Sequence, residues 1–203
     1  KNPPCIDQGY ITFGSFNNLS KITSYVVEIW AQILRSVPKS HLLLKSKQLA
    51  DPKTKSRYLE MFKKQGITEN RIQLYSHLAK AKDHLNLYGR VDISLDPFPY
   101  NGTTTTCESL WMGVGVVTMS GDRHASRVGA SIMTHVGLEK FIAKDTREYV
   151  NLAIEYANNT SYLVDLRTKL RSQVVNSTLC DSKGFARSVE QIYRNMWNQH
   201  IIN

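Results

Sequence analysis

The sequence has 203 residues, of which 41% are hydrophobic and 21% charged, and its formal net charge is +9. This length suits one domain or one large lobe of a bigger enzyme. It contains no run of eighteen apolar residues, and its first residues lack the apolar core of a secretion signal, so we expect no membrane span and a cytoplasmic location. The widely spaced cysteines Cys5, Cys107 and Cys180 predict neither a disulfide framework nor a zinc site.

The excess positive charge is concentrated between Arg35 and Lys82. A basic stretch can attract nucleic acid, an acidic protein or an anionic membrane surface. Few aromatic residues that could stack on bases are interleaved with these charges. A solvated helix face is therefore the favoured interpretation, and nucleic acid is a disfavoured partner.

In chain order, apolar and β-branched runs alternate with segments of helical periodicity. Residues 1–9 are predicted to be a linker from a missing N-terminal part. Strands are predicted at residues 10–16, 41–45, 71–75, 91–95, 115–119 and 141–143. Helices are predicted from Ser24, which can cap the first one, to Val37, and then at residues 52–64, 82–88, 125–133, 147–158 and 161–171, with a further helix following Thr103 to Thr106.

This alternation predicts an α/β fold with a doubly wound parallel sheet, formed by residues 10–180. A last helix at 183–198 carries a strong apolar stripe, and we expect residues 181–203 to pack back on the lobe or toward a missing lobe. Ligands of such sheets bind outside the carboxyl ends of the strands. Lys21, His84 and the segment from Thr103 to Glu108 each follow a predicted strand, so all three are expected at that edge.

The stretch from Tyr100 to Trp111 reads YNGTTTTCESLW and follows a predicted strand. A turn that leads into a helix start aims free backbone N–H groups at an anion, and threonine hydroxyls can cap the helix or donate to phosphate oxygens. Glu108 lies one turn further along, where a carboxylate can accept hydrogen bonds from a ribose diol. The pattern therefore indicates a nucleotide site, and an ordinary threonine-rich helix cap is the alternative.

Three ordered blocks, residues 11–21, 100–111 and 117–131, make the sequence resemble the C-terminal catalytic lobe of the O-linked N-acetylglucosamine transferases, including their SPINDLY-like plant relatives. The likeness extends over nearly the whole chain. It implies a Rossmann-like C-terminal lobe of a glycosyltransferase-B fold, usually preceded by tetratricopeptide repeats. The implied reaction transfers a sugar, most simply N-acetylglucosamine from UDP-N-acetylglucosamine, to Ser or Thr of an acceptor protein.

The resemblance also implies roles for individual residues. Lys21 is similar to the catalytic lysine that contacts the donor phosphates, and Asn18 to a polar residue near them. Thr104 and Thr105 resemble the pair at the helix tip that binds pyrophosphate, and Thr103, just before them, is a further candidate for binding the donor. The resemblance implies that Glu108 holds the ribose and that His84 packs on the uracil ring. It also implies that the backbone of Ala79 forms hydrogen bonds with the base.

The sequence also departs from the animal members of the family, which have His at position 103, Lys at 81 and Arg at 87. These positions hold Thr103, Ala81 and Leu87 here, and they leave the identity of the base and sugar open. The chain lacks an Asp-x-Asp motif, so we expect catalysis without a metal ion or other cofactor, with the leaving diphosphate stabilised by Lys21 and the helix N-terminus. The base that activates the acceptor is expected in the missing lobe.

Other functions compete with this one. The departures also fit a non-catalytic nucleotide-binding scaffold, and the basic stretch fits a module that binds nucleic acid or an acidic partner. A dehydrogenase is disfavoured because Gly113 to Thr118 lacks a third glycine and enters a predicted strand, whereas the dinucleotide motif follows one.

Overall fold

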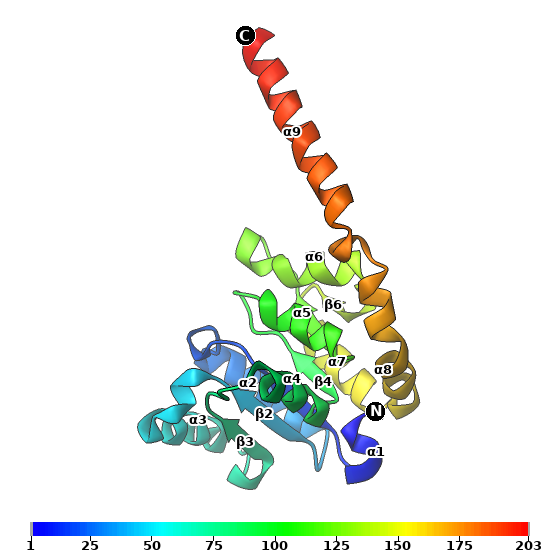
Figure 1. Cartoon of the computed structure of the whole chain (residues 1–203). Helices are drawn as coiled ribbons and strands as arrows, with labels where there is room; N and C mark the ends of the chain where they lie inside the picture. The colour runs from blue at the N-terminus through cyan, green and yellow to red at the C-terminus, as the bar shows by residue number, and fades with distance from the viewer. Residues whose placement is uncertain (1, 203) are drawn as a thin grey trace.

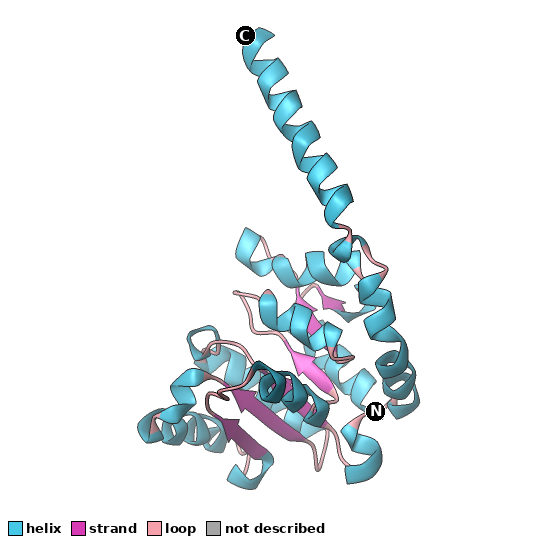
Figure 2. Ribbon diagram, in the orientation of Figure 1, coloured by secondary structure: helices cyan, strands magenta, loops and turns pink. Residues whose placement is uncertain are grey.

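The computed structural model describes residues 2–202, and within them six parallel strands form one sheet in the order β3-β2-β1-β4-β5-β6. The strands are β1 (Thr12–Ser15), β2 (His41–Lys45), β3 (Ile72–Tyr75), β4 (Ile93–Leu95), β5 (Gly115–Met119) and β6 (Ile142–Ala143). The chain reverses its direction of winding between β1 and β4, which lie side by side in the middle of the sheet (Figure 2). The predicted doubly wound parallel sheet is confirmed.

Helices cover both faces of the sheet (Figure 1). They are α1 (Pro4–Gln8), α2 (Ser24–Ser36), α3 (Pro52–Lys64), α4 (Ala81–Leu87), α5 (Thr104–Trp111), α6 (Val128–His135), α7 (Thr146–Ala157), α8 (Thr160–Val175) and α9 (Ser182–Ile202). The predicted first residues of two helices were wrong. Thr23, not Ser24, caps α2 by accepting from the N–H of Val26, and a 3-10 turn at His124–Ser126 delays α6 to Val128.

Alternation along the strands divides the core between the two faces. Phe13, Leu42 and Leu44 belong to the large cluster that α2 and α3 share with α7, whereas Leu43 and Phe16 pack with Tyr88 in a second cluster on the other face. In the large cluster the indole of Trp30 donates to Tyr149 Oη at 3.2 Å, and Tyr149 Oη donates to the carbonyl of Asp96 at 2.9 Å. This chain of bonds ties α2 and α7 to the carboxyl end of β4.

The carboxylate of Asp96 anchors the loop between β4 and α5. It is fully buried and accepts from the N–H of Gly102 at 2.6 Å and from Thr118 Oγ1 at 2.7 Å. Asn101 in the same loop is also buried, and its N–H donates to the carbonyl of Ala125 at 2.9 Å. Burial raises the pKa of Asp96 to about 7, opposed by these two hydrogen bonds and by the charge of Lys21.

The two ends of the chain differ from the sequence-based expectations. Residues 1–9 were expected to be a linker, but α1 lies there, and Cys5 is buried with its N–H donating to Asp92 Oδ1 at 2.9 Å. At the other end α9 projects away from the lobe and does not pack back on it (Figure 1). An orientation toward a missing lobe stays a prediction. Its large apolar side chains are exposed: Phe185, Ile192, Tyr193, Met196, Trp197 and Ile201.

Close packing of α6 on the sheet requires Gly129. A Cβ at this position would lie 2.1 Å from Thr118 Oγ1 and 2.6 Å from Asp96 Oδ2. We predict that Gly129→Ala destabilises the fold, because overpacking costs about 1–3 kcal/mol and the gain in helix propensity is at most about 1 kcal/mol. Urea unfolding would measure the difference. Gly89→Ala is the matched control, since a Cβ there meets nothing within 4 Å; equal stabilities of the two variants would contradict the packing.

The raised pKa of Asp96 predicts a pH dependence of stability. The pKa of Asp96 is 3.8 in the unfolded chain and about 7 in the folded protein, so between these values the folded state holds the proton more tightly. The stability that this proton contributes is complete at low pH and is lost as the pH rises through that window. The free energy of unfolding of the wild type, taken relative to Asp96→Asn, is therefore expected to fall between about pH 4 and about pH 7. Urea titrations of both proteins would measure it. A difference that stays constant or grows over this range would contradict the assignment.

Candidate functional site

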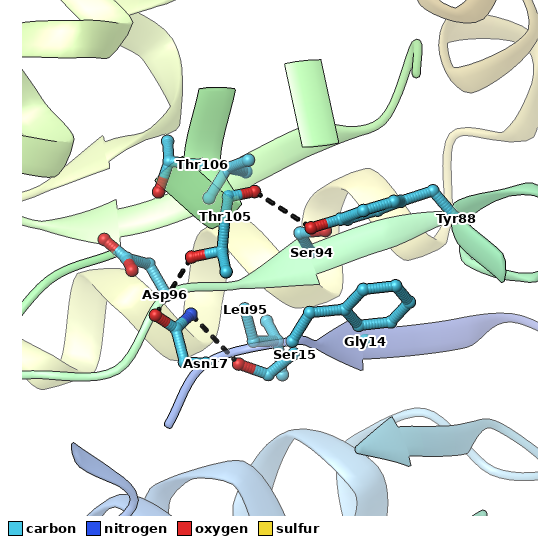
Figure 3. A pocket seen from close by; sticks show the side chains of 11 residues that line it. Gly14, Ser15, Asn17, Tyr88, Ser94, Leu95, Asp96, Thr105 and Thr106 are labelled. Atoms are coloured by element: carbon cyan, nitrogen blue, oxygen red, sulfur yellow. Dashed lines mark hydrogen bonds between the residues drawn. The ribbon is translucent and has the colours of Figure 1, made fainter. Parts of the chain in front are cut away.

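The candidate site lies at the carboxyl edge of the sheet, where β1 and β4 diverge. The loops after these strands bring Asn17 and Lys21 next to the loop that leads into α5. A cavity of about 10 Å³ sits between the two strand ends and α5, lined by Asn17, Asp96 and Thr105 among others (Figure 3). This volume suits a group no larger than a water molecule. A nucleotide would therefore lie across the open rim.

Backbone N–H groups without hydrogen-bond acceptors lie at the N-terminus of α5. Within residues 2–202, no hydrogen bond uses the N–H of Thr103, Thr104, Thr105 or Thr106. The side chain of Thr103 does not cap the helix, so the simple-cap interpretation is wrong for this residue. Thr103 and Thr104 are exposed, whereas Thr105 is half-buried. Thr106 is buried. Unpaired N–H groups and the positive end of the helix dipole are the features with which helix N-termini bind anions.

The hydroxyl of Thr105 points back toward β1 and away from this tip. Its Oγ1 donates to Asn17 Oδ1 at 3.0 Å, and the amide of Asn17 in turn contacts Ser15 Oγ at 3.4 Å (Figure 3). Gly102 is required beneath this contact, because a Cβ there would lie 2.6 Å from Thr105 Oγ1. Thr105 thus fixes α5 against β1, and its free group toward a ligand is the backbone N–H.

The ammonium group of Lys21 lies beside the loop that precedes α5. It donates to the carbonyl of Asn101 at 2.8 Å and lies 4.0 Å from the centre of the Tyr100 ring. Partial burial lowers the pKa of Lys21, and the nearby charge of Asp96 opposes that shift. Asn18 is exposed, and its Oδ1 accepts from the N–H of Ser20 at 2.9 Å and from Gln48 at 2.7 Å. Its first role is therefore to cap the turn that carries Lys21.

His84 and Glu108 are brought into direct contact. His84 Nε2 lies 2.8 Å from Glu108 Oε2, and Tyr88 Oη donates to the same oxygen at 3.2 Å. Tyr88 Oη also lies 3.2 Å from the carbonyl of Thr105. Burial and the charge of Glu108 raise the pKa of Tyr88, which keeps the hydroxyl protonated as a donor. Both contacts fall on Oε2, so within the described chain Glu108 Oε1 has no hydrogen-bond partner.

Ala79 lies apart from these residues, in the exposed loop between β3 and α4. Among residues 2–202 neither its N–H nor its carbonyl has a hydrogen-bond partner, so both are free to bind a ligand. The loop continues into α4, which carries His84. The structure thus brings Lys21 to the loop that precedes α5, joins His84 to Glu108, and leaves Ala79 in the loop after the edge strand β3.

Several residues of this site were not identified from sequence. Asp96 organises the loop, Tyr88 orients Glu108, and Asn17 holds Thr105. The position of Asp96 directly after a strand at the binding edge was a usable signal. No sequence pattern indicated Tyr88, because its partners lie 17 and 20 residues away on a different helix.

In the part of the chain that the structure describes, no group of three or more His, Cys, Asp or Glu side chains could hold a metal ion. Within those same residues no helix combines the length and apolar character needed to cross a membrane.

Comparison with known proteins identifies close relatives. The chain is 46% identical over 197 residues to a probable UDP-N-acetylglucosamine–peptide N-acetylglucosaminyltransferase SPINDLY of Hordeum vulgare, an alignment that covers 97% of this chain and 21% of that protein. It is 31% identical to the corresponding transferase of Caenorhabditis elegans, covering 94% of this chain and 16% of the relative. The chain therefore spans about a fifth of the length of the curated relatives it matches.

Solved structures of glycosyltransferases have a similar fold. A mutant of the O-GlcNAc transferase of Thermobaculum terrenum superimposes with a TM-score of 0.89 at 35% identity, over 94% of this chain and 36% of that one. The sucrose-phosphate synthase of Thermosynechococcus elongatus matches with a TM-score of 0.62 at 13% identity, over 94% and 46%, which supports the fold alone. The fold is that of one lobe of a glycosyltransferase-B enzyme. The model of glycosyl transferase family 41 matches residues 5–189, and the chain belongs to that family.

Proposed function

We propose that this chain is the donor-nucleotide lobe of a transferase that moves N-acetylglucosamine from UDP-N-acetylglucosamine to Ser or Thr of proteins. The observation that carries the proposal is the set of four free N–H groups on the α5 tip, with the Lys21 ammonium beside the same loop. The names of the relatives in barley and in C. elegans supply the donor and the class of acceptor.

The diphosphate of the donor is proposed to bind at the α5 tip. Backbone N–H groups and a helix dipole bind phosphate oxygens without rearrangement, and a lysine adds a compact positive charge. Asn101 O already holds Lys21 Nζ at 2.8 Å, two residues before the first free N–H. The ammonium group is therefore proposed to donate both to this carbonyl and to a phosphate oxygen.

The nucleoside is proposed to extend from the α5 tip toward α4. Glu108 Oε1 is available to accept from a ribose hydroxyl, while His84 and Tyr88 hold Oε2. The ring of His84 is 17% exposed, enough to offer an edge or face to a base, and the free backbone of Ala79 can read the base by hydrogen bonds. Because Glu108 is held before the ligand arrives, little conformational entropy is lost on binding.

Catalysis by this lobe is proposed to act on the leaving group. Transfer of the sugar leaves a nucleoside diphosphate with growing negative charge, and preorganised donors aimed at that charge lower the barrier. Lys21 and the α5 tip supply those donors. The base that activates the acceptor hydroxyl, and most acceptor contacts, are proposed to belong to another part of the whole protein, so this chain alone should bind nucleotide and transfer no sugar.

The proposal predicts selective binding of a nucleoside diphosphate. Calorimetric titrations of the 203-residue chain with UDP, GDP and NAD in turn should show binding of UDP and none of NAD, because NAD carries its diphosphate between two nucleosides. Binding of GDP in place of UDP would reassign the donor nucleotide. Absence of binding by all three would overturn the transferase proposal in favour of a scaffold.

The phosphate role of Lys21 predicts a loss of affinity in Lys21→Met. A hydrogen bond to a charged group is worth about 1.5–3 kcal/mol, so the dissociation constant for UDP should rise about tenfold or more. Lys53→Met, on the exposed side of α3, removes the same charge as a matched control and should bind UDP like the wild type. Equal affinities of Lys21→Met and Lys53→Met would remove Lys21 from the site.

Metal independence of nucleotide binding is a separate prediction. Because protein donors are proposed to neutralise the diphosphate, the affinity for UDP should be the same in EDTA as in excess Mg²⁺. Calorimetry under the two conditions would measure it. Binding of UDP that disappears in EDTA and returns with Mg²⁺ would contradict the prediction.

A further inference from the structure

A second half-buried lysine at the binding edge has no partner. Lys45 is the last residue of β2, and within residues 2–202 its ammonium group makes no hydrogen bond and no ion pair. Burial lowers the pKa of Lys45, Lys47 lowers it further, and the charge of Glu108 raises it. An unsatisfied, partly desolvated cation is costly unless a ligand supplies an acceptor.

The register of the sheet places Lys45 on the face that carries α4 and α5. Leu44 lies opposite Ser15 of β1, so Lys45 is level with the residue that follows the end of β1. Side chains alternate along a strand, so Lys45 shares its face with Leu43. Leu43 packs with Phe16 and Tyr88 in the second core cluster. Lys45 therefore projects at the carboxyl edge beside that cluster.

The groups around Lys45 are those assigned to the nucleoside. The carboxylate of Glu108 acts on its charge, whereas the carboxylate that acts on Lys21 is Asp96. The ring of Phe16, in the cluster beside Lys45, lies 5.7 Å from the ring of His84. Lys21 thus lies by the loop that precedes α5, whereas Lys45 lies at the end of β2, beside the cluster whose Phe16 contacts His84.

An ammonium group donates three hydrogen bonds and accepts none, so it selects a ligand atom that is an acceptor. Resting on the proposed function, we propose that Lys45 recognises a ring carbonyl oxygen of the nucleobase, O4 of uracil or O6 of guanine. Cytosine and adenine present an amino group at the same place, and two donors cannot pair. Lys45 is then a determinant of base specificity in this chain.

The test compares nucleotides whose bases carry either a carbonyl or an amino group at this position. Wild-type chain is titrated calorimetrically with UDP and CDP, and with GDP and ADP, and should bind the carbonyl member of the recognised pair more tightly. In Lys45→Met the affinity for that member should fall about tenfold, the value of one charge-assisted hydrogen bond, while the affinity for the amino member stays nearly unchanged. Lys45→Gln, whose amide both donates and accepts, should bring the two affinities together.

Lys47→Met is the matched control, because it removes an equal charge from an exposed position two residues away. It should keep the preference for the carbonyl base. Equal loss of UDP and CDP affinity in Lys45→Met would assign Lys45 to the phosphates and overturn the inference, as would no loss at all. If the wild type binds none of the four nucleotides, the proposed function itself fails, which is a distinct result.

Discussion

The hydrogen bonds of the Asp96 carboxylate are the constraint on which the rest of the site depends. A buried carboxylate at the end of β4 needs donors, and Gly102 and Thr118 supply them at 2.6 Å and 2.7 Å. Satisfying Asp96 folds the loop back on the strand end. That fold presents the carbonyl of Asn101 to Lys21 and leaves Thr103 and Thr104, at the start of α5, exposed to solvent. Burial of one acid thereby determines where the cation and the free N–H groups stand.

The site separates polar groups that hold the scaffold from polar groups that remain available. The hydroxyls of Thr105 and Tyr88, the side chain of Asn17 and one oxygen of Glu108 are all bonded within the protein. The N–H groups at the α5 tip and the backbone of Ala79 are not. Committed side chains keep their rotamers before a ligand binds, so the available groups are already positioned. Preorganisation of this kind is the main means by which a protein stabilises developing charge.

Sequence reasoning found the sheet and the edge because both follow from local patterns. Alternating strands and helices predict a parallel sheet, and the motif from Tyr100 to Trp111 predicts the turn and helix start at its carboxyl edge. What escaped it depends on contacts between distant residues. The pairing of His84 with Glu108, and the orientation of Glu108 by Tyr88, require knowledge of how α4 packs against α5. The threonine hydroxyls were predicted to cap the helix or to donate to phosphate, whereas the hydroxyl of Thr105 donates to Asn17 Oδ1 at 3.0 Å.

The chain ends were the least predictable part. The apolar stripe of α9 predicts that one side of this helix is buried, but it does not identify the surface that covers it. Within the described chain those side chains are exposed. At the N-terminus, residues 1–9 were predicted to be a linker. The buried acceptor Asp92, 87 residues further along, binds the N–H of Cys5 and draws the segment onto the lobe. Neither outcome is encoded in local periodicity.

The central claim is that the first turn of α5 and Lys21 together hold a diphosphate. An amide-resolved NMR titration of the ¹⁵N-labelled chain with UDP tests it most directly, because it observes the four free N–H groups themselves. The account predicts that the largest shifts occur at Thr103, Thr104, Thr105 and Thr106, with smaller ones at Lys21 and Glu108. Shifts confined to other elements, with these four amides unmoved at saturation, would contradict it.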